Sequence, residues 1–234
     1  MHRFSGEDNG EAPISHHWLD STHITYGVVT LGYVLGNLKL EASAFRGREP
    51  DENRYDIETG SLDSASVRLS FNPTPNWALQ VSQGHIVSPE ALHPDDDVDR
   101  TTASAIYHRN FASARWQTTF AWGRNKPGHG EPTDAYLLES AVLLSRRHTF
   151  FGRLERADKN ELFLEDDPLH GQTFRVGKLT VGYVHDFFAG KYFKLGVGGL
   201  VSGYSLPGEL DAAYGSSPTS YMVFARIKLG EGDK

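Results

Sequence analysis

The sequence of 234 residues contains no cysteine, which excludes a disulfide framework, thiol catalysis and cysteine-ligated zinc. Basic residues are also scarce: 23 Lys and Arg stand against 30 Asp and Glu, for a net charge of −7. This balance argues against a nucleic-acid binder, because phosphate binding needs a concentrated basic face. No apolar run of about 18 residues occurs, so we expect no transmembrane helix. Residues 1–8 lack the apolar core of a signal peptide.

What the sequence does contain is alternation of polar and apolar residues with period two, which is typical of half-buried strands. A helical alternative is disfavoured by the many Gly, Thr, Ser, Val and aromatic residues, and only 135–144 is compatible with a helix. Two of the runs, 23–34 and 173–187, alternate poorly, and their faces stay unassigned. The predicted strands are 23–34, 38–48, 62–71, 77–86, 100–109, 114–124, 135–144, 148–157, 173–187, 193–204 and 220–229.

The last run shows the pattern most clearly. Tyr221, Val223 and Ile227 fall on one face, whereas Arg226 and Lys228 fall on the other. Most runs have about 10 residues, the length that a tilted transmembrane strand needs. The pattern therefore predicts strands with one apolar and one polar face.

The connections between the predicted strands alternate strictly between short turns and long polar loops, five of each. Tight turns on one side and longer loops on the other are typical of an outer-membrane barrel. Aromatic residues lie at both ends of the strands, as in the interfacial girdles of such barrels. They include Tyr33, Phe71, Trp77, Phe111, Trp116, Phe187, Phe188, Tyr192 and Phe193 beside the short turns, and Trp122, Tyr136, Tyr204 and Tyr221 nearer the long loops.

Eleven strands is an odd number, whereas bacterial single-chain barrels close with an even one. We therefore expect this chain to be part of a larger barrel whose earlier strands precede Met1. The alternative is one further strand within 1–22, for example around Ile14–Leu19, which would give a twelve-strand barrel. The expected organisation is an N-terminal loop segment (1–22), a barrel region (23–229) and a polar tail (230–234).

Six segments of the sequence carry a resemblance to a known family: MHRFSG (1–6), EAPISHHWLDSTHI (11–24), AFRGREPD (44–51), YDIETG (55–60), NPTPNW (72–77) and TFAWGR (119–124). With them the sequence resembles the C-terminal portion of an uncharacterised proteobacterial family of outer-membrane β-barrel proteins. Fuller members of that family carry a signal peptide and further strands, and some are encoded near metal-resistance genes. No catalytic or binding residues are established for it.

Charged residues on the polar faces of the predicted strands form the first candidate site. They either line an aqueous path and set its ion preference, or pair across the interior and fill it. Facing lipid instead would cost about 2–4 kcal/mol for each Arg or Lys at mid-membrane. The lumen-lining candidates are Lys39, Glu41, Arg68, Arg115, Glu139, Arg153, Glu155, Lys194 and Arg226, with Lys228 beside them.

Two further groups are candidates for metal binding. His16, Asp20 and His23 offer imidazole and carboxylate ligands for a transition metal, although the adjacent His16 and His17 would point apart on an extended chain. The loop 92–99 holds four Asp residues and offers ligands for Ca²⁺. Hydrogen-bonding histidines and a solvated acidic loop are the structural alternatives.

These observations predict an all-β, antiparallel, up-and-down transmembrane β-barrel in a Gram-negative outer membrane. The predicted function is a passive porin-like channel or envelope component. The family resemblance adds a role in metal tolerance as a hypothesis. Its partners are membrane lipids and small polar solutes or ions, with no nucleic acid, cofactor or assigned catalytic residue. One alternative is a lipid-modifying hydrolase that uses a histidine such as His85, His108, His148 or His185 with a serine. The other is a soluble ligand-binding barrel with its apolar face inward.

Overall fold

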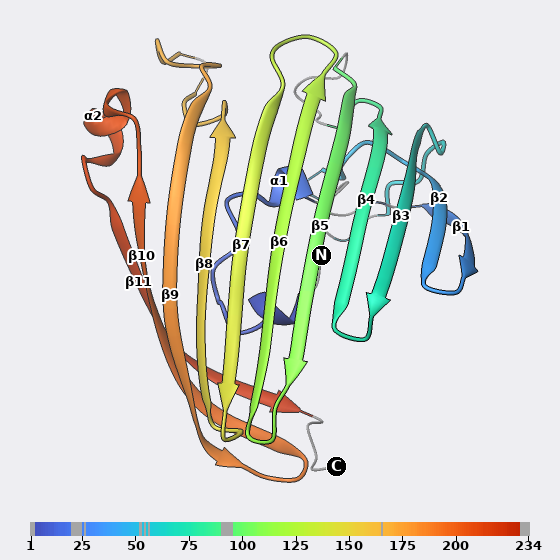
Figure 1. The fold of residues 1–234 in the computed structure, drawn as a ribbon. Coiled ribbons are helices and arrows are strands. Elements are labelled where there is room, and N and C mark those ends of the chain that lie inside the picture. The colour runs from blue at the N-terminus through green and yellow to red at the C-terminus, as the bar shows by residue number, and fades with distance from the viewer. Residues whose placement is uncertain are drawn as a thin grey trace. The chain divides into compact units, whose positions relative to one another are not determined.

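The computed structural model describes residues 3–19, 25, 27–51, 53, 55, 57–89, 96–164 and 166–229. Over this part of the chain, eleven antiparallel strands form one sheet in which each strand pairs with its neighbours in sequence (Figure 1). The strands are β1 (Val28–Leu35), β2 (Leu38–Phe45), β3 (Ser64–Thr74), β4 (Trp77–Ile86), β5 (Val98–Asn110), β6 (Ala114–Pro127), β7 (Thr133–Leu144), β8 (His148–Lys159), β9 (Phe174–Ala189), β10 (Phe193–Ser205) and β11 (Thr219–Leu229).

Each of the eleven predicted strands corresponds to one observed strand, and the all-β, up-and-down architecture is confirmed. The run 135–144 lies in strand β7 and not in a helix. Strand β3 continues to Thr74, although Asn72-Pro73 favours a turn. The pairing with β4 is irregular between Phe71 and Thr74, and a proline without an N–H is tolerated at such an irregularity.

The connections alternate in length as the sequence predicted. Leu35 pairs with Leu38 across a two-residue turn, in which Gly36 has a φ of 57°. Two-residue hairpin turns need such positive φ values, which glycine adopts without steric cost. The short connections are 36–37, 75–76, 111–113, 145–147 and 190–192, and the longer ones are 46–63, 87–97, 128–132, 160–173 and 206–218.

The described residues divide into two compact units. Unit 1 comprises 15–105 and 121–136, and unit 2 comprises 3–14, 106–120 and 137–229. Unit 2 also contains the 3₁₀ helices η1 (Phe4–Gly6) and η2 (Gly208–Leu210) and the helix α2 (Asp211–Tyr214). No helix in the described ranges is long and apolar enough to span a membrane.

A short helix, α1 (His16–Leu19), occupies the place in unit 1 where a twelfth strand was the alternative prediction, so that alternative is wrong. The Trp18 side chain is buried, and its indole Nε1 donates a hydrogen bond to Thr133 Oγ1 at 2.9 Å. Helix α1 also packs directly on Gly123, where a Cβ atom would lie 2.1 Å from the Trp18 carbonyl oxygen. Burial of Trp18 against β6 and β7 therefore holds this turn of helix in place.

The strands of unit 2 expose their apolar side chains and bury their polar ones. Strand β9, whose faces the sequence left unassigned, places Leu179 and Val181 on the exposed face and Lys178, Thr180 and Asp186 on the buried one. Its buried face also carries apolar residues at both ends, such as Val176. This mixture explains why polarity along the sequence did not reveal the two faces.

Two apolar clusters lie on this buried face, one nearer the short turns and the other nearer the long loops. Toward the short turns, Phe151 packs with Ala141, Val184 and Leu200, and its ring lies so close to Gly182 that a Cβ there would be 2.1 Å from it. Toward the long loops, the second cluster consists of Phe174, Val176 and Leu210 with Ile14, Leu162, Phe163, Leu169 and Leu206. Glu139, Arg153 and Lys178 lie between these clusters along the strands, whereas Asp186, Lys194, Arg226 and Lys228 lie nearer the short turns than the first cluster.

Candidate functional site

The buried face of unit 2 is rich in charge. Because strand side chains alternate between faces, successive odd or even positions of β7 to β11 gather there while their neighbours point the other way. We call this set the polar face. It consists of Glu139, Arg153, Glu155, Lys178, Thr180, Asp186, Lys194, Ser202, Ser220, Arg226 and Lys228.

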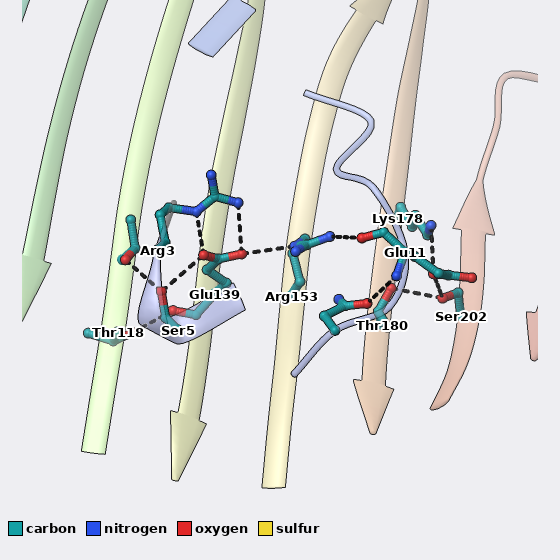
Figure 2. A network of polar contacts seen from close by, with 11 residues as sticks. Arg3, Ser5, Glu11, Thr118, Glu139, Arg153, Lys178, Thr180 and Ser202 are labelled. Atoms are coloured by element: carbon teal, nitrogen blue, oxygen red, sulfur yellow. Dashed lines mark hydrogen bonds and ion pairs between the residues drawn. The ribbon is translucent and has the colours of Figure 1, made fainter. Parts of the chain in front are cut away.

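Residues 3–14, here called the covering segment, make polar contacts with this face. The Glu139 carboxylate lies between two guanidinium groups (Figure 2). Arg3 binds it through Nε and Nη2, with 3.2 Å between Nη2 and Oε2, and Arg153 Nε donates to Oε2 at 2.9 Å. The Glu139 side chain is only 1% exposed. A buried carboxylate needs such countercharges, since burying a lone charge is very costly.

A serine and a glycine of the covering segment complete the environment of Glu139. Ser5 Oγ donates to Glu139 Oε1 at 3.0 Å and lies 2.6 Å from Thr119 Oγ1. A Cβ atom at Gly6 would lie 2.9 Å from both carboxylate oxygens of Glu139. The absence of a side chain at Gly6 therefore lets the backbone approach the carboxylate closely.

Glu11 is held in a second cluster, on the buried side of β9, β10 and β11 (Figure 2). Lys178 Nζ lies 2.8 Å from Glu11 Oε2, and Ser202 Oγ donates to the same oxygen at 2.8 Å. Ser220 Oγ donates to Oε1 at 3.2 Å. The Glu11 carbonyl oxygen accepts a hydrogen bond from Arg153 Nη1 at 2.8 Å, which links this cluster to that of Glu139.

The third cluster joins the covering segment to β11. Arg226 forms ion pairs with both Asp8 and Asp186, with 2.7 Å from its Nη2 to Asp186 Oδ1. Lys228 Nζ lies 3.3 Å from Asp8 Oδ1 and 3.2 Å from Glu7 Oε2. Each carboxylate of the covering segment thus pairs with a cation on the polar face.

The two surfaces have complementary net charges. The covering segment carries one cation, Arg3, and three carboxylates, those of Glu7, Asp8 and Glu11. The polar face carries five Lys and Arg side chains against three Asp and Glu side chains. The covering segment therefore neutralises a surface that would otherwise be cationic.

The ionisation of Glu11 reflects this setting. Burial alone would raise the pKa of its carboxyl group. The hydrogen bonds from Lys178, Ser202 and Ser220 and the charge of Lys178 together outweigh burial and hold that pKa below its usual value near 4.5. Because the pKa is depressed in the folded protein, the resulting stabilisation is fully present above the unfolded-state pKa. It is lost as the pH falls through the lower folded value.

We therefore expect acidification below pH 4.5 to loosen the covering segment. A spin label on an Ala12→Cys variant, the only thiol in the chain, should show increasing mobility over that range in electron paramagnetic resonance spectra. The same label in a Glu11→Gln background should already be more mobile at neutral pH and show a smaller change on acidification. Equal pH profiles in the two backgrounds would contradict the assignment to Glu11.

The predicted lumen-lining residues fall in both units. In unit 2, Glu139, Arg153, Glu155 and Lys194 are buried, and Arg226 and Arg115 are half-buried. In unit 1, Lys39 Nζ lies 2.8 Å from Glu41 Oε1, and Arg68 is the cross-strand partner of Glu41. A lumen-lining role for these nine residues remains a prediction.

The metal candidates are brought together only in part. His16 and His17 lie in the helical turn α1, with ring centroids 4.1 Å apart, and not on an extended chain. Asp20 and His23 lie outside the described residues. Among the described residues, no group of three or more His, Cys, Asp or Glu side chains is placed to hold a metal ion.

In the acidic loop, the described carboxylates pair with histidines. Asp99 Oδ1 lies 2.8 Å from His85 Nδ1, and Asp96 Oδ1 lies 2.9 Å from His129 Nδ1. Among the other histidines considered for catalysis, His148 Nδ1 lies 2.7 Å from the Tyr183 hydroxyl, and its ring lies 4.9 Å from that of His185.

The sequence did not reveal the covering segment or Lys178. Lys178 was missed because the faces of 173–187 stayed unassigned. One signal was present in the sequence: the polar sides of the last two predicted strands carry three Lys and Arg residues, Lys194, Arg226 and Lys228, and no acid. Buried cations need counterions, so carboxylates from elsewhere in the chain were to be expected.

An up-and-down antiparallel sheet with a polar buried face and an apolar exposed face defines a porin-like β-barrel fold. Solved porin structures share it. The chain matches OccAB4 of Acinetobacter baumannii with a TM-score of 0.58 and 12% identity, over 89% of this chain and 56% of that one. It matches OccK10 (OpdN) of Pseudomonas aeruginosa with a TM-score of 0.55 and 12% identity, over 86% and 60%.

The anion-selective porin from Comamonas acidovorans gives a TM-score of 0.53 and 13% identity, over 86% of this chain and 58% of that porin. The chain thus spans less than two thirds of each of these porins. No family model and no curated protein matches the chain. The comparisons therefore show the fold of bacterial outer-membrane porins and assign no family.

Proposed function

We propose that this chain forms part of a larger β-barrel in a Gram-negative outer membrane and that the barrel passes small hydrophilic solutes or ions. The observation that carries the proposal is the inverted burial of unit 2. Its strands expose apolar side chains at mid-length, such as Leu154 (54% exposed) and Val197 (51%), while Glu155 and Asp186 are almost fully buried. Water would favour the opposite arrangement, whereas lipid on the exposed face favours this one.

The aromatic residues support the same conclusion. All nine that the sequence placed beside the short turns have exposed side chains, from 38% for Trp116 and Phe193 to 73% for Tyr192. Exposed rings at strand ends suit a membrane interface, where an amphipathic ring has one side in lipid and the other in the headgroup region. On a water-soluble surface such a set would have no stabilising partner.

The alternatives receive less support. A soluble barrel with its apolar face inward requires the reverse of the burial in unit 2. A hydrolase requires a histidine paired with a serine, whereas His85 pairs with Asp99 and His148 with Tyr183. A link to metal tolerance is not supported by the described residues, among which no metal-binding cluster is found.

In this proposal, the covering segment narrows the aqueous passage along the polar face. Its carboxylates form ion pairs with cationic side chains that would otherwise face solvent, including Lys178, Arg226 and Lys228. The passage is therefore closer to electrical neutrality with the segment docked than without it. Docking would lower both conductance and anion preference.

Substitution of Leu154 by arginine tests the lipid exposure of the outer face. In a bilayer, a charge at the middle of a strand on the lipid side is expected to cost about 2–4 kcal/mol. On a water-exposed surface, the same substitution would change the stability by no more than about 0.5 kcal/mol. Urea unfolding in lipid vesicles measures the difference, with Leu154→Met as the matched control. Equal stability of the two variants would contradict the membrane location.

Channel activity is tested on protein extracted from the membrane fraction. A shift in mobility between boiled and unboiled samples on denaturing gels would identify a closed barrel. Stepwise current increases in a planar bilayer would identify an open path. A shifted band without conductance would contradict the channel and would support an envelope component that passes no solutes.

A further inference from the structure

Charge is strongly segregated between the two ends of the strands in unit 2. The three hairpin ends at the short turns, 106–116, 144–151 and 181–194, contain six Lys and Arg residues and one acid, Asp186. Asp186 is 1% exposed and pairs with Arg226 on the polar face, so it does not offset the cations outside. The cations are Arg109, Arg115, Arg146, Arg147, Lys191 and Lys194.

The opposite end of the same strands is acidic. The segments 158–173 and 205–219 contain seven Asp and Glu residues and a single Lys. Because the sheet is antiparallel and each strand pairs with its neighbour in sequence, the three short turns of unit 2 lie together along one edge, at the same end of the strands (Figure 1). We call this edge, with its hairpin ends, the short-turn edge.

The exposed cations of the short-turn edge are accompanied by exposed aromatic rings. The Arg109 guanidinium lies 5.1 Å from the centroid of the Phe111 ring, and the Lys191 ammonium lies 5.4 Å from that of Tyr192. Arg146 and Arg147 are exposed in the turn between β7 and β8. A cation beside a ring keeps its charge available to an anion while the ring contacts apolar groups.

We propose that the short-turn edge binds anionic phospholipid headgroups, with Arg109, Arg147 and Lys191 at the phosphate groups and the neighbouring rings at the boundary to the acyl chains. The inference rests on the membrane location in the proposed function and goes beyond it by naming the lipid class. Basic side chains near a membrane surface attract anionic lipid, whereas zwitterionic lipid offers no net charge.

The test is lipid titration followed by native mass spectrometry of protein extracted in a non-ionic detergent. The wild type should bind dioleoyl-phosphatidylglycerol at least about tenfold more tightly than dioleoyl-phosphatidylcholine. Each basic side chain contributes a factor of roughly five, so the triple variant Arg109→Gln, Lys191→Gln, Arg147→Gln should bind phosphatidylglycerol on the order of 100-fold more weakly. Glycerol phosphate, which lacks acyl chains, should not compete.

The matched control is a triple variant of exposed cations away from these turns: Lys126→Gln, Arg156→Gln and Arg175→Gln. It should keep the wild-type preference. The inference is overturned if both lipids bind equally, if the control loses as much affinity as the test variant, or if glycerol phosphate competes. A gel shift between boiled and unboiled samples is recorded for every variant. If the wild type shows the gel shift but no preference for phosphatidylglycerol, this inference alone is contradicted. If the wild type shows no gel shift, the proposed function is contradicted.

Discussion

Replacement of Glu139 by alanine is expected to lower the free energy of unfolding by about 3–5 kcal/mol. The substitution leaves Arg3 and Arg153 beside each other with no carboxylate between them, and the Arg153 side chain is only 3% exposed. Removing one partner of a buried ion pair costs more than the pair itself contributes, because an uncompensated charge stays behind. Urea unfolding in detergent micelles, followed by tryptophan fluorescence, measures the change.

Two variants define this expectation further. Glu139→Gln keeps an acceptor for Ser5 and Arg153 but loses the charge, and its cost should be intermediate. Glu131→Ala removes an exposed carboxylate from the connection 128–132 and should change the stability by no more than about 0.5 kcal/mol. If Glu139→Ala costs as little as Glu131→Ala, the triad of Arg3, Glu139 and Arg153 does not anchor the covering segment.

Reversal of the charge at Glu11 is expected to release the covering segment. In Glu11→Lys, two ammonium groups would meet where Lys178 Nζ now lies 2.8 Å from a carboxylate oxygen, and such like-charge contacts cost several kcal/mol. A thiol at position 5, from Ser5→Cys, reports release because Ser5 is a buried residue of the segment itself and the chain has no other cysteine. Its reaction with a maleimide should accelerate at least about tenfold, the effect of 1.4 kcal/mol on an equilibrium.

The double substitution Glu11→Lys, Lys178→Glu restores the ion pair with its polarity reversed and should return the labelling rate toward that of the parent. Glu209→Lys, which reverses an exposed charge in η2, serves as the control and should have no effect on labelling. Slow labelling in Glu11→Lys, or no recovery in the double variant, would contradict the role of this pair. Conductance measured on the same variants tests the channel separately: it should rise in Glu11→Lys and fall again in the double variant.

The positions of the strands and turns follow from the sequence alone. Alternation such as Val223, Ala225 and Ile227 against Phe224, Arg226 and Lys228 is a property of consecutive residues, and it predicted the two faces of β11. Turn residues such as Gly36-Asn37 likewise determine a hairpin locally. The same local information predicted the alternation of short and long connections and, with it, the porin-like fold.

The candidate site depended on tertiary structure. Arg3 and Glu139 are separated by 136 positions in the sequence, and Glu11 and Ser202 by 191. No local pattern relates such residues. Nor did polarity assign the faces of β9, because Val176 and Val184 share its buried side with Lys178 and Asp186. Which cation neutralises which carboxylate is decided only when the covering segment packs on the sheet, since a charge becomes costly to leave unpaired only once burial removes its water.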